Sequence, residues 1–297
     1  MLRPPDVRTN GYHVYAHDGG VLVLPAMRGV ELTAAWWAPD GVSFVEAPLD
    51  FGSIEIGPKP VIDVLNNRIQ AASATANGIG FFRIEGHFVE ATIGPRVTYR
   101  RSVYRSPAEF KFRLEALTID ERGTWWASGH LPNDDLIGLV YQSSDGMTWQ
   151  PVSAKFEGSV IRLYRDGETL VAVHNKQVST ISPAGVTKLC SMKDHLHGAV
   201  VTPAVTLGLG RGFIGVLPAG AKRAKYTTPP AGYADFDVIA FEDGFLMGGD
   251  KGLFSSSDGL TWQPVPSFTG SVSAMVPSAS GVIVVSTGCE VYVVRAA

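Results

Sequence analysis

Two adjacent carboxylates are the first residues whose types could support chemistry. Asp134 and Asp135 follow a short apolar run, and Glu115, Asp120 and Glu121 lie just upstream. Glycoside hydrolysis requires a pair of carboxylates that act as general acid and as nucleophile or base. Carboxylates in surface loops are mostly solvated, so we interpret this group as surface residues rather than as a catalytic pair.

Two histidines have a spacing that a metal site could use. His195 and His197 are two residues apart, so a strand would place both imidazoles on one face, and Cys190 and Asp194 are close in sequence. Zinc accepts such ligands, but no distant partner pattern accompanies them. We therefore expect a solvated histidine-containing loop, with no metal and no other cofactor.

Residues 210–215 read GRGFIG and match the glycine spacing of a dinucleotide-binding fingerprint. That motif requires a following helix whose N-terminus receives the pyrophosphate. The residues that follow, VLPAG, cannot continue a helix. We interpret this segment as a strand that contains glycines.

Tryptophan pairs and an arginine cluster are candidates for contact with a partner. Adjacent residues of a strand face opposite sides, so one Trp of each pair could lie between sheets while the other meets a sugar or a protein. Coverage of both sides is the alternative that we favour. The arginines between residues 96 and 105 alternate with tyrosines, which is typical of a solvated strand face. The candidate contact residues are Trp36, Trp125, Arg100 and Arg101.

Composition limits the classes of protein that fit. The chain has 297 residues, of which 45% are hydrophobic and 18% charged, and its net charge is −3, so no footprint for nucleic acid is evident. The N-terminus lacks an apolar run, and no stretch is long enough to span a membrane, so we expect neither a signal peptide nor membrane insertion. Cys190 and Cys289 are either two buried thiols or one disulfide.

The elements that would position these residues repeat along the chain. Residues 138–152 read GLVYQSSDGMTWQPV, residues 252–265 read GLFSSSDGLTWQPV, and residues 35–48 form a weaker copy with Phe44 in place of Trp. Asp-Gly forces a tight reversal between two strands, and the Asp side chain can accept N–H groups of its own turn. Each copy predicts a hairpin with the tryptophan packed beneath it. The residues that define the hairpins are Asp40, Ser143, Asp145, Gly146, Trp149, Ser256, Asp258, Gly259 and Trp262.

A second strand accompanies these hairpins and recurs by itself. Short apolar runs flanked by glycine have a mean spacing of about 44 residues, which is typical of four-stranded blades. They begin near Gly20, Gly78, Gly123, Gly167, Gly212, Gly244 and Gly281. We predict an all-β chain, residues 1–297 as a single β-propeller domain of about seven blades, with six or eight as alternatives. A parallel β-helix fits less well because its repeats are shorter.

Three details of the propeller can also be predicted. The long first gap indicates an insertion within residues 59–77, and the short gap after Gly212 indicates a truncated blade. Residues 291–295 have the pattern of the third strand of the last blade. A strand from the residues before Gly11 could complete that blade, as ring closure removes an open edge.

The hairpins resemble the Asp-box, or BNR repeat, of the sialidase-like propeller families. The usual form is one residue longer than Ser143–Trp149 and Ser256–Trp262, and this short variant is similar to copies in bacterial and bacteriophage propellers. In these families the box lies at the blade periphery and is structural. The resemblance therefore implies a fold rather than an activity.

Sialidase activity would require an arginine triad that begins in an Arg-Ile-Pro motif before the first box. The nearest match, Phe82-Arg83-Ile84-Glu85, lacks the proline and follows the first hairpin. The resemblance thus favours a non-catalytic structural or receptor-facing propeller of a larger assembly, a bacteriophage tail, located in the virion or otherwise in the cytoplasm. Its partners would be other proteins of the assembly or a host-surface glycan. A sialidase-like glycoside hydrolase and a bacterial carbohydrate-binding or scaffold propeller are the alternatives.

Overall fold

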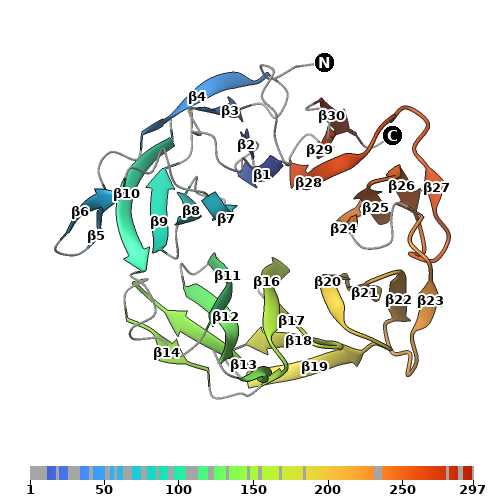
Figure 1. Cartoon of the computed structure of the whole chain (residues 1–297). Helices are drawn as coiled ribbons and strands as arrows, with labels where there is room; N and C mark the ends of the chain where they lie inside the picture. Colours follow the sequence, from blue (N-terminus) through green and yellow to red (C-terminus); the bar gives the residue numbers. More distant parts are fainter. Residues whose placement is uncertain are drawn as a thin grey trace. The chain divides into compact units, whose positions relative to one another are not determined.

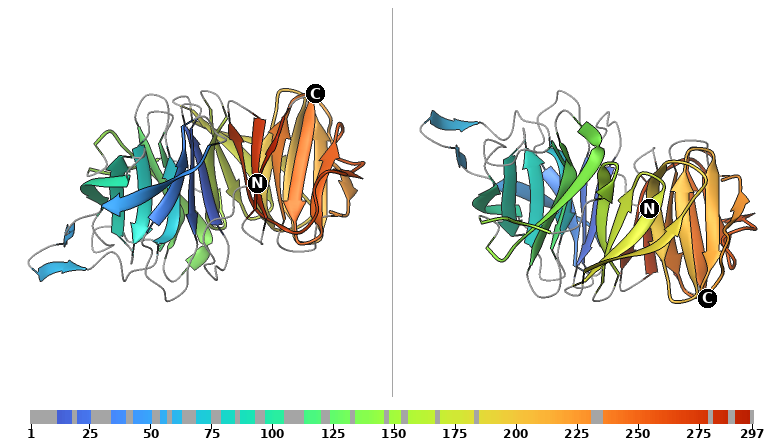
Figure 2. Two further views of the ribbon diagram at one scale, coloured as in Figure 1. Left: turned by 90° about the horizontal axis from the view of Figure 1, so that it is seen from above. Right: turned by 90° about the horizontal axis from the view of Figure 1, so that it is seen from below.

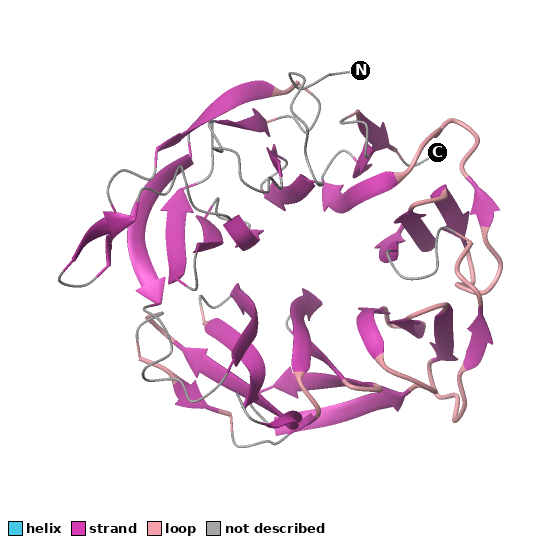
Figure 3. Cartoon of the chain, viewed as in Figure 1, coloured by secondary structure: helices cyan, strands magenta, loops and turns pink. Residues whose placement is uncertain are grey.

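The computed structural model of this chain contains β-strands and no helix in the residues that it describes (Figure 3). Within those residues there is accordingly no helix with the length and hydropathy needed to cross a membrane. The structure describes residues 12–17, 20–25, 34–39, 43–50, 54–56, 59–62, 69–74, 79–84, 87–92, 97–104, 113–119, 124–131, 134–145, 148–152, 156–166, 169–182, 185–230, 236–278, 281–286 and 290–295.

The chain divides into two compact units, of which the first combines Met1–Ser106 with Thr269–Ala297. Its first antiparallel sheet contains β1 (Tyr12–His17), β2 (Gly20–Pro25), β3 (Ala34–Ala38) and β4 (Val45–Asp50). Its second contains β7 (Ile69–Ala74), β8 (Ile79–Ile84), β9 (His87–Thr92) and β10 (Val97–Tyr104), and a short parallel pairing of β10 with β4 joins the two sheets. Its third contains β28 (Val272–Ser278), β29 (Gly281–Ser286) and β30 (Val291–Val294).

An extra hairpin separates the first two sheets of this unit. It consists of β5 (Ile54–Ile56) and β6 (Lys59–Ile62), which pair with each other rather than with a strand of the two sheets, and β5 lies beside β10 (Figure 2). The predicted insertion is confirmed but its bounds were wrong, because β7 already belongs to the second sheet.

The first and last sheets of the chain pack against each other within this unit. Val21 and Val23 of β2 share an apolar cluster with Ile283 and Val285 of β29. β30 is the third strand of its sheet, as predicted. The residues before Gly11, which were expected to supply a fourth strand, lie outside the described part of the chain.

The second unit, Pro107–Phe268, contains four successive antiparallel sheets. The first sheet contains β11 (Arg113–Ile119), β12 (Trp125–Leu131), β13 (Asp134–Ser143), β14 (Gln150–Pro151) and β15 (Phe156–Glu157). The second sheet contains β16 (Val160–Asp166), β17 (Thr169–His174), β18 (Gln177–Ser182) and β19 (Gly185–Ser191). The last two contain β20 (Leu196–Val201), β21 (Val205–Gly210), β22 (Phe213–Pro218) and β23 (Lys225–Thr227), and then β24 (Phe236–Phe241), β25 (Gly244–Gly249), β26 (Gly252–Ser256) and β27 (Gln263–Pro264). Strand order within each sheet follows the chain (Figure 1), except that β15 pairs with β13 instead of β14.

Burial explains why the second strands have continuous apolar sequences. Residues 170–173 of β17 are all at most 3% exposed, because neighbouring sheets cover both faces of this strand. The outer strand β19, by contrast, is mostly exposed. Each pair of successive sheets in this unit shares an apolar cluster of its own.

One predicted second strand is in fact a third strand. The run near Gly212 forms β22, and the second strand of its sheet is β21, which also carries glycines at positions 208 and 210. The same local pattern therefore occurs twice in one sheet. The predicted truncation after Gly212 is wrong, since the β24–β27 sheet has all four strands.

Candidate functional site

The Asp258 turn is organised by its own side chains. Asp258 Oδ1 accepts the backbone N–H groups of Leu260 (2.8 Å) and Thr261 (2.7 Å) and the hydroxyl of Ser256 (3.0 Å). Ser256 Oγ in turn accepts the Gly259 N–H at 2.8 Å. The backbone bond from Thr261 is the main cause that lowers the pKa of Asp258 below its usual value. The turn joins the third and fourth strands of its sheet, as predicted.

This turn also contacts the preceding sheet. Gly259 has φ +72°, and a Cβ there would lie 2.7 Å from Leu207 Cδ2. The Nε1–H of Trp262 donates to the Gly259 carbonyl at 3.0 Å, and the Trp262 ring packs on the cluster shared by the two sheets. Trp262 is half-buried, since it packs against its own turn and over the margin of that cluster.

The Asp145 turn repeats part of this arrangement. Asp145 Oδ1 accepts the Ser143 hydroxyl at 2.9 Å and the Thr148 N–H at 2.7 Å, between the third and fourth strands of its sheet. Trp149 is likewise half-buried. Gly146 and Asp40 lie outside the described residues.

The tryptophans predicted to contact a partner differ in their exposure. Trp125 is 3% exposed and Trp37 is 6% exposed, so the interpretation of Trp125 as a contact residue is wrong. Trp36 and Trp126 are half-buried and pack against the clusters of their units. The burial of Trp37 and Trp125 agrees with the alternative that the sequence favoured, and the partner contact at Trp36 stays a prediction.

The other candidates lie on strands. Arg100 and Arg101 belong to β10, and Arg83 belongs to β8. The sequence suggested a loop at Asp134 and Asp135, but these two residues begin strand β13. The side chains of these five residues lie outside the description, so the partner contact at Arg100 and Arg101 stays a prediction.

The two histidines with metal-ligand spacing do not meet. His195 is exposed, whereas His197 Nε2 donates to the Phe236 carbonyl of the next sheet at 3.2 Å. No group of three or more metal-ligating side chains occurs in the described part of the chain. Cys190 is a free thiol, and burial raises its pKa to about 11. Residues 210–215 form the end of β21, a turn and the start of β22, as expected from the missing helix.

A further histidine, which the sequence analysis missed, is structural. His174 is 3% exposed, its Nδ1 donates to the Glu157 carbonyl at 3.2 Å, and its Nε2 accepts the Ser179 hydroxyl at 2.9 Å. Burial is the main cause that lowers its pKa. Both ring nitrogens are occupied, so His174 fastens its sheet to the preceding segment rather than serving as a catalytic base.

A cation and two aromatic rings form the most distinctive surface group of the second unit. Lys193 Nζ lies 4.7 Å from the ring centroid of Phe213 and 5.0 Å from that of Tyr226. The two rings pack edge to face at 5.8 Å. Phe213 is buried, whereas Tyr226 is 41% exposed. We call Lys193, Phe213 and Tyr226 the cation–aromatic cluster.

The cluster lies in a strongly basic part of the chain that the sequence analysis overlooked. Between residues 185 and 230 the only acid is Asp194. The basic residues there are Lys188, Lys193, Arg211, Lys222, Arg223 and Lys225. A charge count in a sliding window would have found this segment, because the whole chain is slightly acidic.

Comparison with known proteins supports the fold. A scan of protein-family models found none that matches the chain, and a search of curated proteins found no match. Among solved structures, YCF48 bound to D1 peptide is 17% identical with a TM-score of 0.62, covering 95% of this chain and 92% of that one. YCF48 from Cyanidioschyzon merolae is 12% identical with a TM-score of 0.60, covering 96% and 94%.

A third similar structure is larger than this chain. It is PorZ, a bacterial surface component of the type-IX secretion system of Porphyromonas gingivalis, which is 11% identical with a TM-score of 0.55. The alignment covers 98% of this chain and 39% of PorZ. Identities this low indicate the fold alone. With seven sheets of three to five strands in its described residues, the chain is an all-β protein with the β-propeller fold.

Proposed function

We propose that this chain is a non-catalytic β-propeller that binds other proteins within a larger assembly, and that the assembly is a bacteriophage tail. The observation that supports the non-catalytic part is that the described ionisable groups with a shifted pKa all take part in structural contacts. His174 and Cys190 are buried in sheet contacts, Asp258 accepts the N–H groups of its own turn, and the Tyr292 hydroxyl donates to Glu290 two residues away. A catalytic site requires such groups to converge on a space for substrate, and these four belong to separate structural contacts.

The protein-binding part has support from two sides. The cation–aromatic cluster offers an exposed tyrosine beside a lysine, and these residue types suit a protein interface better than a reaction centre. The YCF48 structure contains a bound D1 peptide, so a propeller of this size can serve as a peptide-binding module. The assignment to a phage tail depends on the short Asp-Gly hairpins, which resemble copies in bacteriophage propellers.

Two measurements test this proposal. The purified full chain is incubated with fluorogenic sialosides and aryl glycosides, and we expect no turnover above the buffer rate. Turnover that disappears in Arg83→Ala or Asp135→Asn would contradict the non-catalytic assignment.

The tail assignment is tested on virions from the organism that encodes the chain. The virions are purified by density gradient and analysed by mass spectrometry. We expect the chain in the tail fraction, and its absence from intact virions would refute the tail assignment.

A further inference from the structure

We propose that an extended, acidic segment of a partner protein docks along the outer strand β23, with its carboxylates facing the cation–aromatic cluster and the lysines beside it. This inference rests on the protein-binding function proposed above and adds the location and the chemistry of the partner. Three features of the β20–β23 sheet carry it: charge, a fixed aromatic surface and an open strand edge.

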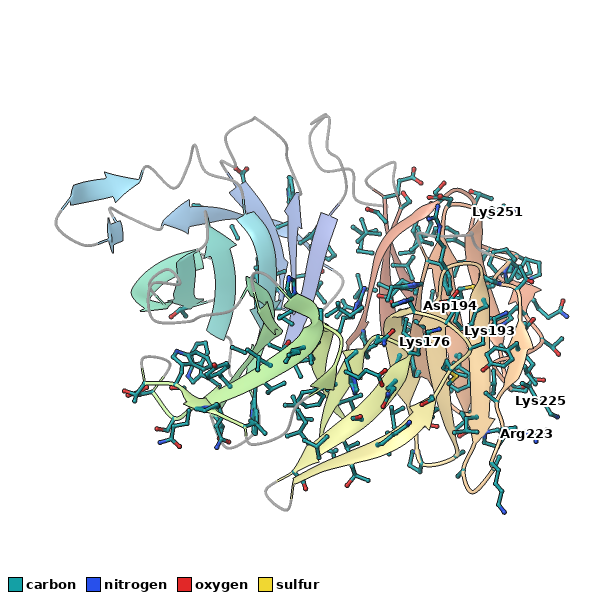
Figure 4. All side chains as sticks on the ribbon, turned by 60° about the horizontal axis from the view of Figure 1, so that its bottom comes forward. Lys176, Lys193, Asp194, Arg223, Lys225 and Lys251 are labelled. Atoms are coloured by element: carbon teal, nitrogen blue, oxygen red, sulfur yellow. The ribbon has the colours of Figure 1, made fainter. Side chains whose placement is uncertain are left out.

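Charge selects an acidic partner. Residues 185–230 hold six basic side chains and one acidic side chain. The one acid, Asp194, has its Oδ1 3.9 Å from Lys176 Nζ, so a seventh cation lies beside it. Lys176, Lys193 and Asp194 gather near one end of the sheet, and Lys225 and Arg223 follow along it (Figure 4). Complementary potentials of this kind steer association and favour one class of partner over others.

The backbone around Lys193 is held in place. Residues 192–195 connect β19 to β20, and the segment is fastened to the β17–β18 turn at both ends. The Met192 N–H donates to the Lys176 carbonyl at 2.7 Å, and the Leu196 N–H donates to the Asn175 carbonyl at 2.8 Å. The backbone that carries Lys193 is therefore already ordered before a partner binds.

Tyr226 packs closely on strand β22 because the residue opposite it, Gly215, has no side chain. It is paired with Gly215 across β22 and β23, and a Cβ on Gly215 would lie 3.0 Å from Tyr226 Cε1 and 2.5 Å from Met192 Sδ. The tyrosine thus lies close over the strand while much of its ring faces solvent. An amphipathic ring in this position provides contact area for a peptide at low entropic cost.

The edge of β23 distinguishes a polypeptide from other anions. On one side β23 pairs with β22, and in the described part of the chain no strand pairs with its other side. Of the corresponding strands, β14 and β27 contain two residues each, of which one is a proline without an N–H, whereas β19 has no proline. β23 has three residues and no proline. An extended peptide can add to such an edge through its backbone, which a nucleic acid cannot do.

The test uses a fluorescein-labelled peptide of alternating Glu and Val and measures its binding to the full chain by fluorescence anisotropy. We expect saturable binding that weakens when the salt concentration rises, since the contact is largely ionic. Lys193→Glu combined with Lys225→Glu should weaken it by about tenfold or more. The matched control is Lys251→Glu, an exposed lysine in the turn between β25 and β26 of the neighbouring sheet, which should leave the affinity within about twofold.

Further arms separate this inference from its alternatives. Thermal unfolding of the double variant should match that of the parent, so weaker binding cannot be attributed to misfolding. Tyr226→Ser should also weaken binding of the peptide. N-methylation of alternate peptide residues should weaken binding as well, because methylated amides cannot donate a hydrogen bond to β23. Unchanged affinity in either case, no binding of the Glu-Val peptide, equal binding of a Lys-Val peptide, or tighter binding of oligo-dT would overturn the inference. None of these outcomes touches the non-catalytic assignment, which depends on the glycoside assays.

Discussion

Two neighbouring sheets of the second unit share one core and carry opposite charge. Leu207 and Ile214 of the β20–β23 sheet and Phe245 and Met247 of the β24–β27 sheet belong to the same apolar cluster. Residues 185–230, which include the first sheet, hold six bases and one acid, whereas residues 236–278, which include the second, hold five acids and the base Lys251. We call them the basic sheet and the acidic sheet.

The contrast separates what the fold requires from what the fold leaves free. The shared cluster takes side chains from strands that both sheets possess, so residue size and hydropathy are constrained there. Apart from Asp237 on β24, the charges of the two sheets sit in the turns and on the outer strands, where most side chains face water and can change sign without affecting the core. The function of a repeated sheet is therefore set by its outer residues, while its stability is set by its inner ones.

The largest expected effect comes from breaking the shared core. Leu207→Ala on the basic sheet and Met247→Ala on the acidic sheet each remove a side chain that is 0% exposed. Each should lower the free energy of unfolding by about 2–5 kcal/mol, because a cavity remains where the side chain was. Urea unfolding followed by tryptophan fluorescence measures this. A loss below about 1 kcal/mol for either variant would mean that its sheet does not depend on the common core.

Next in size is the contact between the acidic sheet's turn and the basic sheet. Gly259→Ala places a Cβ on Leu207 and forces a residue with φ +72° to carry a side chain. We expect a loss of about 2–3 kcal/mol from strain and crowding together.

Gly220→Ala on the basic sheet is the matched control for Gly259→Ala. Its φ is +76°, but nothing lies within 4 Å of the added Cβ. It should cost about 1 kcal/mol from backbone strain alone. Equal losses for the two variants in the same unfolding assay would show that the contact with Leu207 contributes nothing.

A smaller effect is expected from the carboxylate that organises the acidic sheet's turn. Asp258→Ala should cost about 1 kcal/mol at neutral pH, because the N–H groups of Leu260 and Thr261 lose their acceptor. The pKa of Asp258 is lowered in the folded chain, so its contribution is present above the unfolded pKa of about 4 and is lost as the pH falls through the lower folded value.

The difference between parent and Asp258→Ala should therefore shrink when the pH is lowered from neutral toward 3. Thermal unfolding at several pH values measures this difference. Asp243→Asn, at an exposed carboxylate in the β24–β25 turn of the same sheet, provides the control and should show little change. A difference that stays constant across the whole range would mean that the charge of Asp258 is irrelevant to the turn.

The sequence predicted best the features that depend on residues close together in the chain. The Asp258 hairpin was predictable because Ser256, Asp258 and Thr261 bond one another within six residues. The second strands were predictable wherever glycine flanked a single apolar run. The β21–β22 pair misled the prediction because both strands are apolar and contain glycine.

Features that depend on register between distant strands were not predictable. The cation–aromatic cluster unites Lys193, Phe213 and Tyr226, which meet only because β23 pairs with β22 so that Tyr226 faces Gly215. The burial of Trp125 was the favoured one of two alternatives, because alternation along a strand places adjacent side chains on opposite faces but does not indicate which of them is covered.

The smallest expected effect concerns the ion pair through which the acidic sheet contacts a strand beyond the basic sheet. Arg162 of β16 has its Nη1 3.9 Å from Asp237 Oδ2 of β24, with side chains 50% and 49% exposed. Exposed pairs at this distance are worth about 0.5 kcal/mol or less, because water screens them and holding two side chains costs entropy. A double-mutant cycle with Arg162→Gln and Asp237→Asn measures the coupling. A coupling above about 1 kcal/mol that survives high salt would mean that the acidic charge is part of the framework. The expected small value instead leaves the charges of both sheets free to serve binding, as the docking of an acidic segment on the basic sheet requires.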